Sequence, residues 1–365
     1  MSATAPPVSG PVLNRSDLVI LGLAGFLVVL AGIAHYGGWT AVAAFVISAG
    51  AVCLLASLVG RSVEQLGDRL GAGATGVLQS ALGNLPELLF ICIFALKAGL
   101  VDVVRAALVG SILANLLLVL GLAFLVGGLK HGTQQLGSER ARTIVVLMLL
   151  SVTAMAIPSI AHLLHTPVSE HETTFSLIVS VILLGLFALS LPFSLRRDQA
   201  ATDDPAAHHE TPRWPIWLAI LVLALASVLA AFTSDWFVDA LTPAMDALGV
   251  SEAFAGLVVV AIAGNAVENV VGIQLAAKGQ SQYAFSVVLN SPIQIALVLA
   301  PVLVLVSQIF GLVTFTLVFS PLLVAVLVLA IVLAAFIAFD GESTWLEGAS
   351  LIALYAIIAT SFWWG

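Results

Sequence analysis

Charged residues are scarce in this sequence. They make up 9% of its 365 residues, whereas soluble domains carry about 25%. Hydrophobic residues reach 61%, the mean hydropathy is +1.15, and no polar stretch is long enough for a separate soluble domain. The composition therefore excludes a soluble protein and predicts an integral membrane protein whose partner is the lipid bilayer. We expect no nucleic-acid partner.

Other absences narrow the class further. The only two cysteines, Cys53 and Cys92, lie in apolar runs, so we interpret them as small apolar side chains and not as a disulfide framework. No His-Glu-x-x-His motif is present, which argues against an intramembrane metalloprotease. The N-terminus "MSATAPPVSGPVLNRSD" lacks the features of a cleaved signal peptide. A retained first span is therefore predicted from Leu18.

Apolar stretches of about 20 residues can cross a bilayer, and the sequence contains eleven of them. We predict an all-α polytopic membrane protein with eleven transmembrane helices. The predicted spans lie near 18–36, 39–60, 71–96, 103–128, 143–163, 174–194, 214–234, 254–277, 283–310, 314–339 and 346–363. Residues 1–17 are expected to form a disordered tail, and 195–213, which contain acids and histidines, a cytoplasmic linker.

Lysine and arginine in the loops predict the orientation, because cytoplasmic loops carry an excess of them. With the N-terminus inside, the outer segments hold only Lys97 and Arg105. The inner segments hold Arg15, Arg61, Arg69, Lys130, Arg140, Arg142, Arg196, Arg197, Arg213 and Lys278. A cytoplasmic N-terminus follows, and an odd number of spans places the C-terminus outside.

The chain contains an internal repeat. "GNLPELLFICIFALK" (83–97) matches "GNAVENVVGIQLAAK" (264–278), and "GSILAN" (110–115) matches "NSPIQI" (290–295). Five predicted spans fall in each unit, 39–194 and 214–363, so the two copies must have opposite orientations. Inverted repeats with interrupted helices in matching positions indicate a transporter whose site lies near the bilayer midplane.

Glu87 and Glu268 are the only acids deep in the predicted spans, and each lies within about 5 Å of its span's middle. Opposed helices would bring the two carboxylates to a common centre. Such a pair cannot remain doubly ionised without a cation. It therefore binds either protons or a divalent cation, and this competition is the physical basis of cation/proton exchange.

Neighbouring polar residues can complete an oxygen site, which suits a hard cation such as Ca²⁺. Gly and Pro breaks would free backbone carbonyls as further ligands, and no buried His or Cys accompanies the acids. Besides the two glutamates as metal ligands, the candidate cation- and proton-binding residues are Gly83, Asn84, Gly264, Asn265, Ser111, Asn115, Ser291 and Gln294. Polar contact between helices is an equally good interpretation for four of these residues, which are Ser111, Asn115, Ser291 and Gln294.

The remaining polar groups have simpler interpretations. We interpret Lys97 and Lys278 as anchors at span ends, and His208, His209 and Glu210 as part of a solvated linker. A second group of histidines, at the end of the fifth span and in the next loop, could tune the response to pH, although a plain loop is the simpler interpretation. This group consists of His162, His165 and His171.

"GNLPELLFICIFALKAG", "GSILANLLLVLGLAFLVGG", "GNAVEN" and "SPIQIALVLAPVLV" together resemble the calcium/proton antiporters of the CAX type, within the calcium/cation antiporter superfamily. The resemblance covers nearly the whole chain. It implies eleven helices, with two inverted five-helix repeats after an extra first helix. It also implies a cation and proton site on Glu87 and Glu268, beside Asn84 and Asn265.

The sequence departs from this family at two positions. The family often has His where this chain has Asn269, and Gly where it has Asn290, so the cation selectivity is not fixed by the resemblance. We expect export of cytoplasmic Ca²⁺ in exchange for protons, in the cell membrane of a prokaryote, with no cofactor beyond the transported ions. Na⁺/H⁺ or K⁺/H⁺ exchange is the alternative on the same scaffold, and a cation channel or an intramembrane enzyme the alternative of another class.

Overall fold

The computed structural model describes residues 12–70, 85–136, 138–201 and 213–364. The regular elements in these residues are helices, apart from two short strands. The elements are α1 (Arg15–Tyr36), α2 (Ala41–Leu70), α4 (Leu85–Lys97), α5 (Val101–Leu113), η1 (Ala114–Val119), α6 (Leu120–His131), β1 (Gln134–Gln135), α7 (Ser138–Leu163), η2 (Pro167–His171), α8 (Glu172–Ala201), α9 (Ile216–Leu248), α10 (Glu252–Phe254), η3 (Ala255–Val260), α11 (Ala261–Gly264), α12 (Ala266–Ala277), α13 (Ser281–Gln294), η4 (Ile295–Leu299), α14 (Ala300–Ile309), α15 (Pro321–Asp340), β2 (Glu342–Ser343) and α16 (Trp345–Ser361). Elements η1, η3 and η4 are π-helical, and η2 is a 3₁₀ helix.

Seven helical runs in the described residues are long and apolar enough to cross a membrane. An eighth consists of two helical segments, Glu252–Gly264 and Asn269–Ala277, that are bent by 62° relative to each other. Shorter apolar helices cover Leu88–Lys97, Pro321–Ile337 and Trp345–Ser361. The prediction of a helical, polytopic membrane protein is confirmed by this arrangement and by the fold comparison below.

Several helices are longer than their predicted spans. α1 begins at Arg15 because the Asp17 carboxylate accepts from the backbone N–H of Asn14 and so caps the first turn. α2 continues to Leu70 instead of ending near 60, and α9 to Leu248 instead of 234. Gly249, with φ +64°, then ends α9 in the left-handed conformation. Most of the predicted span 71–96 lies outside the described residues.

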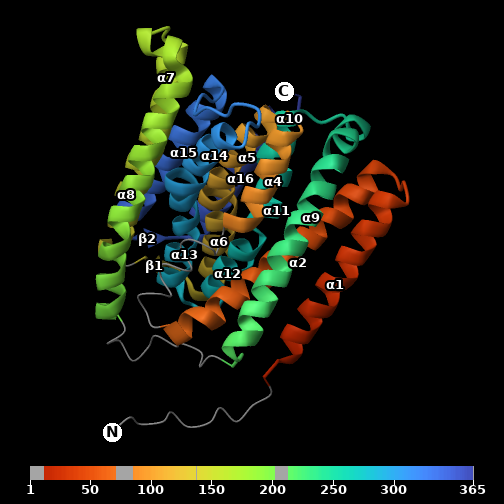
Figure 1. Ribbon diagram of the computed structural model, residues 1–365. Coiled ribbons are helices and arrows are strands. Elements are labelled where there is room, and N and C mark those ends of the chain that lie inside the picture. Colours follow the sequence, from red (N-terminus) through yellow and green to blue (C-terminus); the bar gives the residue numbers. More distant parts are fainter. Residues whose placement is uncertain (1–11, 71–84, 137, 202–212, 365) are drawn as a thin grey trace.

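The helices form two packing groups with separate apolar cores. One core contains buried residues of α1, α2 and the start of α9, and in Figure 1 these three helices lie along one side of the molecule. The larger core contains buried residues of α5, η1, α13, η4 and α15, together with others from the first half of α2 and the second half of α9. Helix α4 contacts both α5 and α9, so it lies where the two groups meet.

A polar cluster connects α1, α2 and the start of α9 at one end of this group. Asp17 is 5% exposed and accepts from Arg61 Nη1 at 2.6 Å and from Trp214 Nε1 at 3.4 Å. The Gln65 side-chain oxygen accepts the backbone N–H groups of Arg213 and Trp214 at 2.8 and 2.9 Å. The prediction that residues up to 17 form a disordered tail is therefore wrong for Asp17, whose partners lie far away in the sequence.

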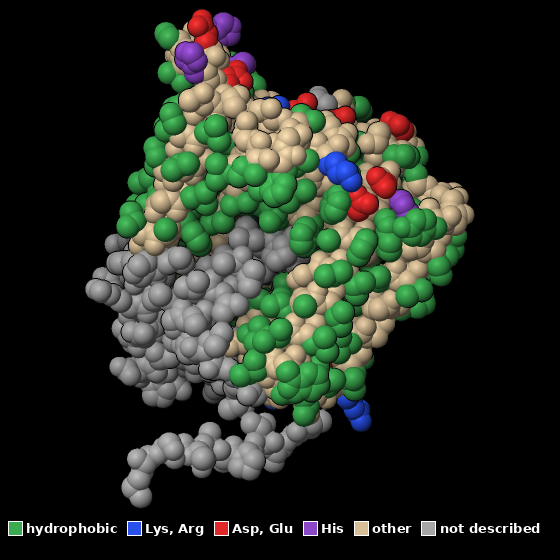
Figure 2. Space-filling model, in the orientation of Figure 1, with side chains coloured by type: hydrophobic (Ala, Val, Ile, Leu, Met, Phe, Trp, Pro, Cys, Tyr) green, Lys and Arg blue, Asp and Glu red, His purple; other side chains and the backbone are tan. Residues whose placement is uncertain are grey.

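Two features of the connecting loops were not predicted. β1 and β2 form an antiparallel pair with Gln134 opposite Ser343, so the loops that follow α6 and α15 meet at one end of the bundle. At the other end, the α7–α8 hairpin extends beyond its neighbours (Figure 1). Figure 2 shows acidic and histidine side chains gathered at this upper end, above a flank covered largely by apolar side chains.

Candidate functional site

The structure describes six of the ten predicted site residues in full. Gly83 and Asn84 lie outside the described residues. Glu87 lies in α4 and Glu268 in α12, but their side chains also fall outside the described part of the structure. The remaining residues lie at the break between α11 and α12, at the junction of α5 with η1, and at the end of α13.

The helix that leads to Glu268 is interrupted at Asn265. This residue has φ −122° and ψ 22°, and it separates α11 from α12. A break leaves carbonyls at the end of the first segment without helical partners. The Asn265 Nδ2 group donates to the Ala261 carbonyl at 2.7 Å, and the Cys53 thiol donates to the Ala263 carbonyl at 3.6 Å. The expected break is present, but these two carbonyls are already paired and are not free ligands in this conformation.

Cys53 therefore has a role that the sequence did not reveal. Cys92 is fully buried, as expected of a small apolar side chain, whereas Cys53 is only half-buried, and the structure shows neither of them in a disulfide. Because the thiol of Cys53 reaches a carbonyl beside the helix break, α2 is linked directly to the candidate site.

Four predicted residues meet in one chain of hydrogen bonds. Asn115 Nδ2 donates to the Ser111 carbonyl at 2.9 Å and to Ser291 Oγ at 3.3 Å. Ser291 Oγ in turn donates to Asn265 Oδ1 at 3.1 Å. All four residues are at most 1% exposed. The chain thus connects α5 and η1 to α13 and to the break before α12.

Several oxygens around this chain have no hydrogen-bond partner. Ser111 Oγ, Asn115 Oδ1 and Gln294 Oε1 are buried without one, and so is Asn269 Oδ1. Buried polar atoms are almost always paired, so such a group of orphans needs a water or an ion to complete it. Hydroxyl and amide oxygens are hard, neutral ligands of the kind that suits Ca²⁺. The donor set therefore fits a hard cation.

The π-helical segments adjoin these residues. η1 begins directly after α5, which carries Ser111, and contains Asn115; η4 begins directly after Gln294. π-helical turns often occur at functional sites. The polar residues of the apolar spans were a signal for the site, but nothing in the side-chain pattern distinguished these turns from ordinary α-helix.

α5 and η3 approach each other unusually closely beside the site. A Cβ added to Gly110 would meet the Leu257 backbone, with the carbonyl carbon 2.6 Å away. A Cβ added to Gly256 would lie 2.7 Å from Ala106 Cβ. Small residues allow two membrane helices to pack backbone against backbone. Only glycine fits at these two positions, and Gly110 immediately precedes Ser111.

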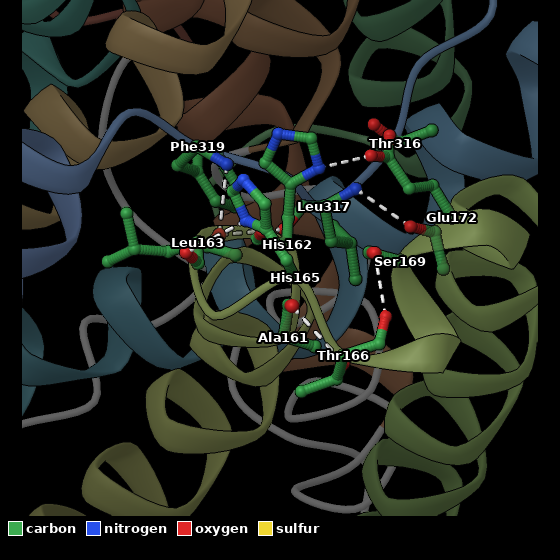
Figure 3. A network of polar contacts seen from close by, with 12 residues as sticks. Ala161, His162, Leu163, His165, Thr166, Ser169, Glu172, Thr316, Leu317 and Phe319 are labelled. Carbon is green, nitrogen blue, oxygen red and sulfur yellow. Dashed lines mark hydrogen bonds and ion pairs between the residues drawn. The ribbon is translucent and has the colours of Figure 1, made fainter.

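The other predicted polar groups lie elsewhere. Lys97 and Lys278 are exposed at the ends of α4 and α12, as expected of anchors, and His208, His209 and Glu210 lie outside the described residues. His162 pairs with Glu172 in a polar network at the α7–α8 hairpin, which Figure 3 shows from close by. His165 Nδ1 lies 3.1 Å from the His162 carbonyl, whereas His171 is exposed in η2.

This polar network connects the α7–α8 hairpin to the segment before α15. Ser159 Oγ donates to the Leu317 carbonyl at 3.0 Å and accepts from the Phe319 N–H at 2.9 Å, and Ser176 Oγ accepts from the Leu317 N–H at 3.1 Å. In the described part of the chain, no group of three or more His, Cys, Asp or Glu side chains could hold a metal ion. These contacts favour a structural role for the network.

The family model described as sodium/calcium exchanger protein matches residues 40–196 and 218–364. The chain belongs to this family. The matched blocks nearly coincide with the two predicted repeat units, and the resemblance to calcium/cation antiporters is confirmed. The family consists of exchangers, so its members are transporters and not enzymes.

Similar proteins include several calcium transporters. The chain is 35% identical to the Ca(2+)/H(+) antiporter of Synechocystis sp., over 90% of this chain and 93% of that protein. It is also 35% identical to the Ca(2+)/H(+) antiporter ChaA of Bacillus subtilis, with 96% and 99% covered. The vacuolar calcium ion transporter of Schizosaccharomyces pombe is 33% identical, with 91% and 82% covered.

Solved structures agree with this fold. The structure of native YfkE has a TM-score of 0.80 and 33% identity, and the comparison covers 94% of this chain and 99% of that one. The H+/Ca2+ exchanger CAX has a TM-score of 0.72, with 96% and 92% covered. Its 16% identity shows likeness of fold alone.

Proposed function

We propose that the protein is a secondary active antiporter that exports Ca²⁺ from the cytoplasm in exchange for protons by alternating access. The single observation that carries this proposal is the hydrogen-bond chain from Asn115 through Ser291 to Asn265, with unpaired buried oxygens around it. This chain adjoins the helices that carry Glu87 and Glu268. The names of the similar antiporters support Ca²⁺ and H⁺ as the substrates.

The chemistry of exchange is a competition for the two carboxylates. When Ca²⁺ enters, its charge compensates both anions, and the neutral oxygens of Ser111, Asn115 and Gln294 replace part of its hydration shell. When the cation leaves, two carboxylates facing a low-dielectric site must take up protons, because two uncompensated charges there are unfavourable. Each state excludes the other, and the two ions therefore move in opposite directions.

The proposed topology has eleven crossings, with an extra first helix followed by two inverted five-helix repeats. In this proposal the seven long runs, the bent pair and the three short apolar helices would each contribute to one crossing. The matching positions of η1 and η4, after Ser111 and Ser291, support the repeat. We propose a cytoplasmic N-terminus and an external C-terminus, in the cell membrane of a prokaryote.

The test uses purified protein in proteoliposomes. Ca²⁺ is added to one side while a pH dye reports proton counterflow, and Na⁺, K⁺, Mg²⁺ and Mn²⁺ are tested in the same way. We expect coupled Ca²⁺/H⁺ exchange, and exchange of Na⁺ or K⁺ without Ca²⁺ would contradict the proposed substrate. Ca²⁺ flux without compulsory proton movement would instead indicate a channel.

The two glutamates are tested by Glu87→Gln and Glu268→Gln. Glutamine keeps the shape but removes the titratable charge, so each variant should reach the membrane and lose coupled transport. The matched control is the linker double variant His208→Ala with His209→Ala, which should exchange at a near-normal rate. Substantial coupled transport by either glutamine variant would show that the acids are not the exchange site.

A further inference from the structure

Helices α1 and α9, which lie on the same side of the molecule in Figure 1, meet in an aromatic cluster that the exchange site does not use. The imidazole of His35 stacks on the indole of Trp236, with ring centroids 5.8 Å apart and planes inclined by 23°. The Tyr36 ring meets both rings edge-on. Gly32, at i−3 from His35, lets the indole approach, because an added Cβ would lie 3.2 Å from Trp236 Cη2.

An acid of α9 completes this cluster. His35 Nε2 lies 3.9 Å from Asp239 Oδ2, which is too far for a hydrogen bond but close enough for an ion pair. The contact therefore becomes attractive when the imidazole carries a charge. An indole face within about 6 Å attracts a cation, and His35 lies in the last turn of α1, where the helix dipole attracts one too.

The charged groups on the packed elements add to this attraction. On α9, Asp235 precedes Asp239 by one helical turn and is half-buried. In the sequence of α2, which also packs against α1, the first charged residue is Arg61, far from the end that begins at Ala41. Lys97 ends α4, which packs against α9, and it is the opposing positive charge at this face of the bundle. Two carboxylates of α9 thus face one ammonium group of α4.

Helix α9 connects the cluster to the helices of the exchange site. Phe237 directly follows Trp236, stacks on Phe45 of α2 with ring centroids 4.8 Å apart, and is fully buried in the larger core. α9 also packs against α4, the helix that carries Glu87. A contact that fixes Trp236 to α1 therefore restrains a segment of α9 that lies against both α2 and α4.

The two ends of α1 are attached by different chemistry. At the inner end, Asp17 accepts from Arg61 of α2 and from the indole of Trp214, just before α9. At the other end the attachment contains His35. Histidine is the side chain that changes its charge within the physiological pH range, so the outer attachment is the one that responds to pH.

We propose that His35 is an accessory proton-binding site on the outer face, at which external protons join α1 to α9 and slow exchange. This inference rests on the proposed function and on the proposed orientation, in which α1 ends outside. A ligand shifts an equilibrium toward the conformation that binds it. An acidic outer solution therefore holds the protein in the conformation described here and lowers the rate of turnover, while the transported protons bind elsewhere, at the glutamates.

The first experiment measures Ca²⁺ efflux from loaded right-side-out vesicles, with the internal pH buffered and the external pH varied from about 5 to about 8. His35→Gln keeps a polar side chain that cannot take up a proton. At acidic external pH we expect this variant to exchange about two- to fivefold faster than the wild type, which is the effect of one partly exposed ion pair. At alkaline external pH the two rates should agree. Asp239→Asn removes the partner and should behave like His35→Gln.

His171→Gln is the matched control, because His171 is an exposed histidine in η2, at the same face of the membrane in the proposed orientation. It should keep the wild-type dependence on external pH. The inference would be overturned by a wild-type dependence in His35→Gln, or by an equal acceleration of that variant at every external pH.

Tryptophan fluorescence tests the proton site without transport. A protonated imidazole quenches the emission of a stacked indole, so the wild-type protein in lipid nanodiscs should lose emission as the pH falls. The loss should be smaller in His35→Gln and in Trp236→Phe, and it should persist in His171→Gln. An equal loss in all of these proteins would overturn the proton site. Failure of the wild type to exchange Ca²⁺ for protons, with the emission change present, would instead overturn the proposed function and leave the proton site supported.

Discussion

Gly110→Ala tests the close packing of α5 against η3. The new Cβ would lie 2.6 Å from the Leu257 carbonyl carbon, whereas ordinary contacts begin at 3.4 Å. The two segments must therefore separate by about 0.8 Å or more, because the obstacle is backbone and not a flexible side chain. Overpacking of this kind costs roughly 1–3 kcal/mol, and Ser111 would move with its helix.

The assay is thermal unfolding in detergent, followed with a thiol-reactive dye that gains access to the fully buried Cys92. We expect the Tm to fall by about 2–6 °C, from roughly 2 °C for each kcal/mol in a chain of this size. Ca²⁺/H⁺ exchange should fall by about tenfold or more, since displacement of a site by roughly 1 Å can cost a hundredfold.

Gly185→Ala is the control, because a Cβ at this position in α8 meets no atom within 4 Å. Alanine favours a helix over glycine by roughly 0.5–1 kcal/mol, so this variant should be as stable as the wild type or more so. Wild-type Tm and activity in Gly110→Ala would refute the reasoning, as would an equal loss in both variants.

Two further predictions concern hydrogen bonds. Asp17→Asn removes the charge that pairs with Arg61. The Arg61 side chain is 34% exposed, so screening by water limits the loss of stability to about 1–3 kcal/mol. The Tm of this variant should fall, whereas substitution of an exposed acid, Asp340→Asn, should leave the Tm unchanged. Ser291→Ala leaves Asn115 and Asn265 without a shared partner and should raise the KM for Ca²⁺ severalfold in the exchange assay. Ser286→Ala, which removes a hydroxyl bonded within its own helix, should not.

The sequence drew attention to polar residues that the structure brings together, because polar residues in apolar spans have few possible partners. Apart from carbonyls of their own helical turns, Asn115, Ser291 and Asn265 could satisfy their side chains only by meeting one another or an ion, and they do meet. The repeated Gly-Asn motif likewise predicted a break in the helix before Glu268. Local chemistry was sufficient here, because the environment of these residues is uniformly apolar.

Other features depend on partners that no local pattern identifies. Asp17 follows a polar N-terminal segment and so resembles part of a tail, but its partners Arg61 and Trp214 lie 44 and 197 residues away. The π-helical segments reflect a change in backbone hydrogen bonding, and apart from Asn115 their side chains are as apolar as those of neighbouring turns. Neither feature has a signature in composition or periodicity.

The division of the bundle into two cores bears on how an exchanger of this kind could move. The hydrogen bonds that join Asn115, Ser291 and Asn265 connect helices outside the α1–α2–α9 group. One polar link from that group to the site is the Cys53 thiol on the Ala263 carbonyl, at 3.6 Å, and a thiol is a weak donor. Sliding of α2 past the helix break would therefore give up this weak hydrogen bond, together with apolar contacts that α2 and α9 make in the larger core, and would keep the oxygen chain intact. The same movement would free the Ala263 carbonyl as an additional ligand for the cation.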